Sequence, residues 1–173
     1  MMLALLSAVT FLAWMAQSCP TKVVDLGYAK HIPTWTYTTS SGLKISVYKN
    51  IRFANSPTGD LRFRMPDTNL PKQVGIQDGT KQLEDRGCIS TAPSYVPFPG
   101  LNGTTYGVED CLFLDVFVPE GVKAGDKVPV LHYYIGSGYA FGGKDIFNDP
   151  SGLFDYMKMK GEENFIFVAH NYR

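Results

Sequence analysis

The stretch Pro129-Val-Leu-His-Tyr-Tyr-Ile-Gly136-Ser137-Gly138-Tyr139-Ala-Phe-Gly142 decides the fold of this 173-residue chain. Its apolar and aromatic first half predicts a strand over residues 128–135 that is buried on both faces, as in a sheet covered by helices. The second half is rich in glycine, which lets the backbone approach another group closely. We therefore predict a strand that leads directly into a functional loop.

The segments after this loop predict a helix and another strand. Asp149 and Pro150 are typical of a helix N-terminus, with Asp149 as the N-cap and Pro150 at the first helical position. Residues 161–164 end that helix, and residues 165–172 form a further apolar run. The order strand, loop, helix, strand predicts a βαβ unit with parallel strands in an α/β domain. We expect His132 and His170, which fall within the two apolar strands, to be satisfied core histidines.

Antiparallel strands are predicted before this unit. Residues 35–39 and 43–48 are β-prone runs on either side of Ser40-Ser41-Gly42, which is typical of a hairpin turn. Residues 50–55 are expected to add a further strand. Residues 112–118 alternate large apolar residues with Asp115 and predict another. Most of residues 66–108 reads as irregular.

Composition narrows the function classes. The chain has 16 basic and 16 acidic residues and 45% hydrophobic residues, so it can form one domain with a substantial core. It has no run of like charges, and we expect neither nucleic acid nor an anionic membrane surface as a partner. Its three cysteines and three histidines are scattered without metal-ligand spacing, so we expect no metal and no cofactor.

The N-terminus predicts secretion. Residues 1–16 carry no charged side chain and are too short to span a bilayer, which takes about 20 residues. The small-x-small pattern Ala16-Gln17-Ser18 follows. We therefore expect a signal peptide over residues 1–18, a mature domain over 19–173, a secreted product and no stable membrane anchor. The alternative is a buried N-terminal helix or strand.

Secretion would allow a disulfide between cysteines and a glycan on one asparagine. In an oxidising compartment Cys88 and Cys111 can form a disulfide, which leaves Cys19 over. If the signal peptide is absent, three buried free thiols become the better interpretation. Asn102 begins the single N-x-S/T sequon, lies in a polar loop, and is a candidate glycosylation site.

Several segments, in the same order, resemble the type-B carboxylesterase/lipase family, which includes the cholinesterases. These are residues 61–66 (LRFRMP), 109–116 (EDCLFLDV, with Asp115 where the family usually has Asn), 129–142, 149–152 (DPSG) and 171–173 (NYR). The resemblance runs from about residue 43 to the last residue. It implies an α/β-hydrolase fold, of which this chain would be the N-terminal portion: a mixed sheet with an N-terminal β-hairpin and an incomplete core.

The resemblance also implies roles for individual residues. Gly136, Ser137 and Gly138 match the oxyanion loop, where the Ser137 and Gly138 positions would supply backbone N–H donors to a tetrahedral intermediate. The chain departs from the family pattern at Ile135 and at Ser137, which replaces a glycine. The family disulfide would join Cys88 to Cys111. A structural ion pair would join Arg62 to Glu109.

The family nucleophile sits on a G-x-S-x-G elbow, and no such pentapeptide occurs in these 173 residues. We therefore expect a fragment of a secreted serine carboxylic-ester hydrolase that carries the oxyanion loop without the triad and is inactive alone. A small-molecule ester would be the substrate of a full-length form. The alternative is a secreted, non-catalytic relative with a binding or adhesion role, in which no elbow would follow Arg173.

Two further interpretations fit less well. A dinucleotide-binding domain needs a third glycine at position 141, which is Phe141. A disulfide-stapled β-rich binding module explains the cysteines but not the βαβ unit. In the α/β-hydrolase arrangement, the strand at 128–135 would lack one neighbour. We expect its apolar edge to allow self-association.

Overall fold

The structure is a computed structural model that describes residues 23–80, 87–91, 94, 105–136, 138, 140–146 and 148–173. The predicted signal peptide, Cys19, Asn102 and Ser137 lie outside these residues. The described elements are β1 (Val24–Asp25), β2 (Lys30–His31), β3 (Trp35–Thr38), β4 (Lys44–Arg52), the 3₁₀ helix η1 (Gly59–Leu61), β5 (Ile76–Gln77), β6 (Ser90–Thr91), β7 (Thr105–Tyr106), β8 (Phe113–Pro119), β9 (Val130–Tyr133), α1 (Ser151–Met159) and β10 (Ile166–His170).

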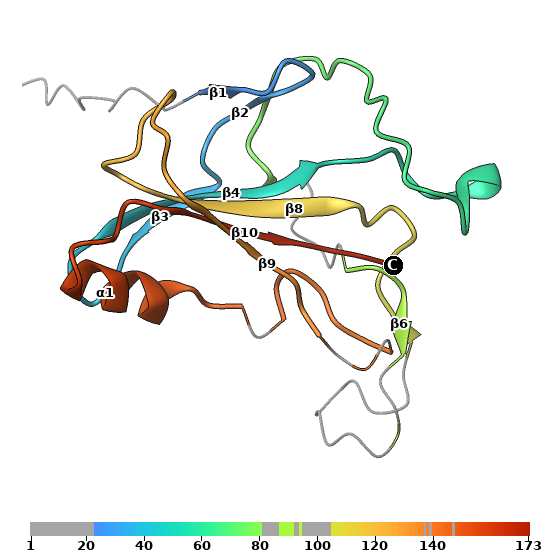
Figure 1. Ribbon diagram of the computed structural model, residues 1–173. Helices are drawn as coiled ribbons and strands as arrows, with labels where there is room; N and C mark the ends of the chain where they lie inside the picture. Colours follow the sequence, from blue (N-terminus) through green and yellow to red (C-terminus); the bar gives the residue numbers. More distant parts are fainter. Residues whose placement is uncertain are drawn as a thin grey trace, which may run out of the picture.

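A five-stranded mixed sheet with the order β3-β4-β8-β10-β9 organises the chain (Figure 1). The pairs β3–β4, β4–β8 and β8–β10 are antiparallel, whereas β9 and β10 are parallel. The predicted hairpin and the predicted βαβ unit are therefore both confirmed. In the view of Figure 1, the short strands β1 and β2 lie above the five-stranded sheet and α1 lies below it.

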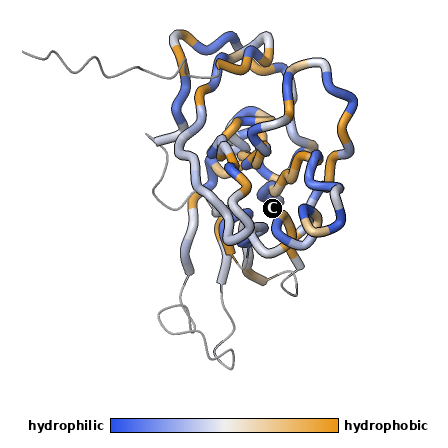
Figure 2. The backbone as a smooth tube through the Cα atoms, turned by 90° about the vertical axis from the view of Figure 1, so that its left-hand side faces the viewer, coloured by the Kyte–Doolittle hydropathy of each residue, from blue (hydrophilic) through white to orange (hydrophobic). Residues whose placement is uncertain are grey.

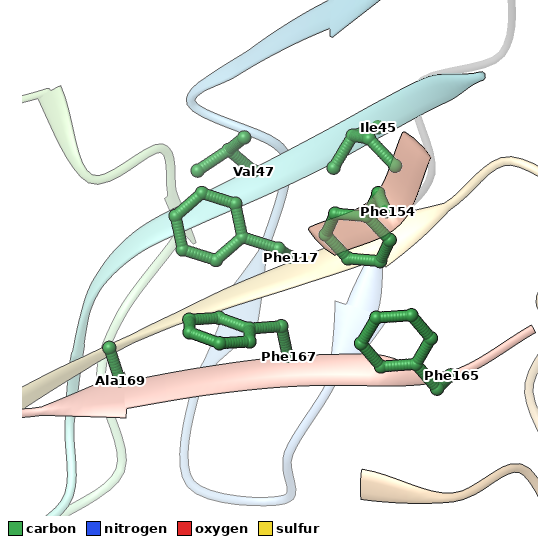
Figure 3. Packing of buried hydrophobic residues seen from close by; sticks show 7 residues of the cluster. All are labelled: Ile45, Val47, Phe117, Phe154, Phe165, Phe167 and Ala169. Atoms are coloured by element: carbon green, nitrogen blue, oxygen red, sulfur yellow. The ribbon is translucent and has the colours of Figure 1, made fainter. Parts of the chain in front are cut away.

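One face of the sheet forms the core with α1. Alternate residues of β8 are buried, as the period of two along a strand requires. Figure 2 shows hydrophobic and hydrophilic residues interspersed along the backbone as a whole. Phe154 from α1 is fully buried and stacks on Phe165 with ring centroids 4.6 Å apart. Figure 3 shows the cluster: Ile45, Val47, Phe117, Phe154, Phe165, Phe167 and Ala169.

The strand expected over residues 50–55 is not a separate element. β4 continues to Arg52, and its pairing with β8 shifts between Tyr48 and Ile51. Asn50 occupies this irregularity with a φ of +55°, in the left-handed region. Such a β-bulge inserts an extra residue and bends the strand without ending it.

The helix starts one residue later than predicted. Asp149 was expected as the N-cap, but α1 begins at Ser151 and Pro150 is the cap residue. The Asp149 carboxylate still serves the helix start, because its Oδ1 atom accepts hydrogen bonds from the backbone N–H and the hydroxyl of Ser151, at 3.0 and 2.5 Å.

β9 contradicts the expectation of a strand buried on both faces. It spans only Val130–Tyr133 and is the edge strand of the sheet within the described part of the chain. Val130 is 59% exposed and Leu131 is 40% exposed. The run is apolar as its composition indicates, but exposure depends on what covers the strand, and within the described part of the chain only β10 pairs with it.

Candidate functional site

The glycine loop, defined here as residues 136–143, follows the carboxyl end of β9, and residues at the end of β10 hold both of its flanks. The Tyr172 hydroxyl donates a 2.7 Å hydrogen bond to the carbonyl oxygen of Ile135, just before the loop. The backbone N–H of Lys144, just after the loop, donates a 2.8 Å bond to Oδ1 of Asn171. Because β9 and β10 are parallel, their carboxyl ends meet at one edge of the sheet, and the loop lies there.

The middle of the loop has the backbone conformation that glycine allows. Gly138 has a φ of +60° and Gly142 a φ of +134°, in a region that L side chains rarely adopt. The carbonyl of Ala140 accepts a 2.9 Å hydrogen bond from the N–H of Thr91. Gly136 and Gly138 are exposed. Ser137 lies outside the described residues, so the pair of N–H donors at Ser137 and Gly138 stays a prediction.

A disulfide is connected to the end of the glycine loop through Asn171. Cys88 and Cys111 are bonded, with Cα atoms 4.9 Å apart, and both residues are buried. The carbonyl of Cys111 accepts a 2.9 Å hydrogen bond from Nδ2 of Asn171. Asn171 therefore connects the disulfide to the end of the glycine loop.

Arg62 and Glu109 lie together as the resemblance implied. Two hydrogen bonds join them: Nη2 to Oε2 at 2.8 Å, and Nε to Oε1. The side chains are 52% and 34% exposed, so the pair is a surface pair rather than a buried one. The hydrogen bonds from Arg62 hold the pKa of the Glu109 carboxyl below its usual range. Arg173 donates to the carbonyls of Leu61 and Arg64 in the same region.

The sequence interpretation missed a second pair beside it. Arg52 makes two 2.7 Å hydrogen bonds to the carboxylate oxygens of Asp110, and its guanidinium lies 4.4 Å from the ring centroid of Phe113. Each acidic residue of the E-D-C-L segment thus has its own arginine. The two adjacent acidic residues before a buried strand were the feature of the sequence that could have predicted this second pair.

The sequence interpretation also missed a buried charge cluster at the end of the loop. Asp115 on β8 is fully buried, and Lys144 is 2% exposed. The Nζ atoms of Lys49 and Lys144 lie 2.5 and 3.2 Å from Asp115 carboxylate oxygens, and both lysines also contact Asp145. Burial lowers the pKa of Lys144 to about 8, and the Asp115 charge opposes that fall. The only sign of this cluster in the sequence was Asp115, which stands where the family usually has asparagine.

The histidines differ from the expectation of core residues in apolar strands. His132 is exposed and His170 is half-buried. Their rings face each other, with His132 Nε2 and His170 Nδ1 2.9 Å apart. Burial, together with the nearby His132, lowers the pKa of His170. The expectation was wrong because both side chains lie on a sheet face that α1 does not cover.

A cavity of about 720 Å³ opens beside these residues. That volume is within the range of small-molecule sites, about 300–1,000 Å³. A smaller space of about 70 Å³ lies against the glycine loop, and Ile89, Tyr172 and Arg173 line both. The large cavity is otherwise lined mainly by apolar residues, the disulfide and the Arg62–Glu109 pair; its apolar members include Phe53, Pro57, Phe63, Val108 and Leu112.

The described residues hold no group of three or more histidine, cysteine, aspartate or glutamate side chains arranged to bind a metal ion. No helix among them is both long enough and apolar enough to cross a bilayer.

Comparisons with known proteins identify the family to which this fold and site belong. Residues 34–173 match the model of the carboxylesterase family. The chain is 35% identical over 155 residues to a secreted triacylglycerol lipase of Gibberella zeae, covering 82% of this chain and 26% of the lipase. It is 31% identical over 139 residues to an acetylcholinesterase of Caenorhabditis elegans, covering 78% of this chain and 21% of that enzyme.

A solved structure agrees. The crystal structure of Aspergillus niger EstA superimposes with a TM-score of 0.61 and 29% identity, covering 88% of this chain and 26% of EstA. The chain thus spans about a quarter of the length of these relatives, and its fold is the N-terminal portion of an α/β-hydrolase fold. Because the family match covers most of the chain, including both the glycine loop and the E-D-C-L segment, the chain belongs to the carboxylesterase family.

Proposed function

We propose that this chain is the N-terminal part of a secreted carboxylic-ester hydrolase and supplies its oxyanion loop. One observation carries the proposal: Asn171 and Tyr172 hold both flanks of the glycine loop at the carboxyl edge of the parallel strands. Backbone N–H donors that are fixed before reaction stabilise the developing negative charge without reorganisation. The secreted lipase among its relatives supports secretion.

The proposed division of labour follows from the residues. The glycine loop would bind the oxyanion, and the cavity of about 720 Å³ beside it would receive part of the ester. No G-x-S-x-G pentapeptide occurs in the 173 residues, so we propose that the chain alone lacks the nucleophile. Without a nucleophile, an oxyanion loop has no tetrahedral intermediate to stabilise.

An esterase assay tests this proposal. The 173-residue chain is compared, on an activated short-chain ester, with a form extended along the coding sequence to include a G-x-S-x-G elbow and its triad partners. We expect turnover from the extended form only. Activity in the 173-residue chain that is lost on Ser137→Ala would show a local nucleophile and contradict the proposal. An inactive extended form with an intact elbow would also contradict it.

A matched pair of glycine variants tests the role of the loop in the extended form. Gly138 and Gly161 both have positive φ, +60° and +72°, and an added Cβ at either would meet no atom within 4 Å. Gly138→Ala and Gly161→Ala therefore impose similar backbone strain at two places. We expect only Gly138→Ala to lower kcat, by about 10²-fold, the size of losing one oxyanion donor. Equal losses in both variants would contradict a catalytic loop.

A further inference from the structure

The charge cluster at the end of the glycine loop connects that loop to two strands of the sheet. It consists of Lys49 on β4, Asp115 on β8, and Lys144 and Asp145 after the loop. Two ammonium groups and two carboxylates balance in charge. Three members are buried, whereas the Asp145 side chain is 53% exposed. A buried lysine or aspartate is tolerated only when it is paired and hydrogen-bonded, so Lys49, Lys144 and Asp115 depend on one another.

Lys144 is held along its whole length. Its backbone N–H donates to Asn171 at 2.8 Å, and its carbonyl accepts from Nδ2 of Asn148 at 2.7 Å. Its Nζ atom donates to Asp115 at 3.2 Å and to Asp145 at 2.7 Å. The residue stands two positions after Gly142, so these bonds fix the point where the loop returns to the sheet.

Asp115 is anchored independently of the lysines. Its Oδ1 atom accepts a 2.9 Å hydrogen bond from the backbone N–H of Asn50, within the β4 bulge. Two central strands of the sheet, β4 and β8, thus fix the position of the carboxylate. Lys144, which binds this carboxylate, is thereby fixed at the end of the loop. The Lys49 ammonium, which also touches Asp115, lies 5.7 Å from the ring centroid of Trp35 on β3.

We propose that Lys144 is a positioning residue, whose ammonium, paired with Asp115, fixes the C-terminal end of the glycine loop relative to the sheet. The catalytic meaning of this position rests on the proposed function, since it matters for turnover only if the loop binds an oxyanion. The placement of the loop itself can be measured without any ester. A purely structural pair would instead stabilise the whole domain evenly.

Amide hydrogen exchange of the whole 173-residue chain separates the two roles. Lys144→Met keeps the length of the side chain and removes its charge, and Asp115→Asn keeps the shape of the carboxylate. Loss of a hydrogen bond to a charged group destabilises the segment that the bond holds. In Lys144→Met we therefore expect exchange in the loop peptide to rise by about tenfold or more, whereas the β3–β4 hairpin keeps its protection. Asp115→Asn should raise loop exchange too, but hairpin protection is compared in Lys144→Met because Asp115 also contacts Lys49 and Asn50 of β4.

A surface pair gives the control. Lys30 Nζ and Asp25 Oδ2 are 3.7 Å apart, and both side chains are more than half exposed. Lys30→Met and Asp25→Asn make the same chemical changes away from the loop and are expected to leave its exchange unchanged. The double variant Lys144→Met/Asp115→Asn should loosen the loop by less than the sum of the two single variants, because both remove the Lys144–Asp115 contact.

The titration of Lys144 gives a second readout that general destabilisation would not move. NMR of labelled lysine should show a group titrating near pH 8, and Asp115→Asn should lower that pKa further because the stabilising carboxylate charge is lost. Unchanged loop exchange in Lys144→Met, or an equal rise in loop and hairpin, would overturn the proposal. If Asp115→Asn does not fold, Lys144→Met decides alone. An inactive extended enzyme would leave these results unaffected.

Discussion

Arg52 and Asp110 form two parallel hydrogen bonds of 2.7 Å, next to the Arg62–Glu109 pair on the same segment. The two pairs differ in exposure: the Arg52 side chain is 18% exposed, whereas that of Arg62 is 52% exposed. A charge-assisted bond contributes more where water competes less. The two arginines therefore make different contributions to folding.

Replacing the two arginines one at a time measures this difference. Arg52→Met is expected to lower the free energy of unfolding by about 1–3 kcal/mol, because the Arg52 guanidinium is largely shielded from water and its loss removes two hydrogen bonds to Asp110. Arg62→Met is expected to cost less, since water already competes for the more exposed Arg62 guanidinium. Urea denaturation of both variants gives the comparison. A larger loss in Arg62→Met would contradict the ranking.

The Arg62–Glu109 pair also predicts a dependence on pH. Because Arg62 lowers the pKa of Glu109 in the folded state, the pair stabilises the fold above the carboxyl pKa of the unfolded chain. That stabilisation is lost as the pH falls through the lower folded pKa. In Arg62→Met, carboxyl NMR should show the Glu109 pKa rise toward its ordinary value. Arg64→Met, which removes a bond to a backbone carbonyl instead, should leave the pKa of Glu109 unchanged.

The disulfide predicts a larger loss. It joins residues 23 apart in sequence, and closing a loop of about that length stabilises a fold by roughly 3 kcal/mol in the chain-entropy model. We expect reduction by dithiothreitol, or the double variant Cys88→Ser/Cys111→Ser, to lower the unfolding free energy by about that amount. The double variant should show no further change with reductant. Equal stability of the oxidised and reduced chains would show that the disulfide does not constrain unfolding.

The sequence predicted the topology because topology follows from local patterns. The hairpin around Gly42 and the parallel βαβ unit rest on turn residues, on period-two alternation and on the helix start near Asp149. The hairpin and the βαβ unit rest only on neighbours along the chain. The Cys88–Cys111 disulfide, which the structure contains, was instead implied by the family resemblance of the E-D-C-L segment.

Features that depend on what covers a surface could not be predicted in this way. The apolar run at Val130 and Leu131 indicated burial, yet both residues are exposed on the edge strand. His132 and His170 became neighbours through the strand register, which a single sequence does not fix. The partners of Asp115 come from positions 49 and 144, 66 and 29 residues away, and no local pattern joins them.

The contact between Phe154 and Phe165 tests how much α1 contributes. Phe154 is fully buried and stacked, with its ring 23° from the plane of the Phe165 ring. Phe154→Ala is expected to cost about 3–5 kcal/mol, from lost burial and the cavity left behind. Tyr156→Ala on the same helix, where the residue is 52% exposed, is expected to change stability by less than about 0.5 kcal/mol. Thermal unfolding of both variants makes the comparison, and similar losses would contradict a core role for Phe154.

The edge strand β9 predicts self-association of the 173-residue chain. Val130 and Leu131 are exposed, and both line a mainly apolar cavity of about 500 Å³ together with Leu153 and Met157 of α1. An exposed apolar edge offers unpaired backbone groups to a second copy of the chain, and a lysine on the edge is a common protection against such pairing. We expect light scattering after gel filtration to show a mass that rises with concentration, and Leu131→Lys to restore the monomer. Ile76→Lys, which places the same charge on the exposed strand β5, should not. A wild-type chain that stays monomeric across the concentration series and melts cooperatively would show that β9 is protected in solution.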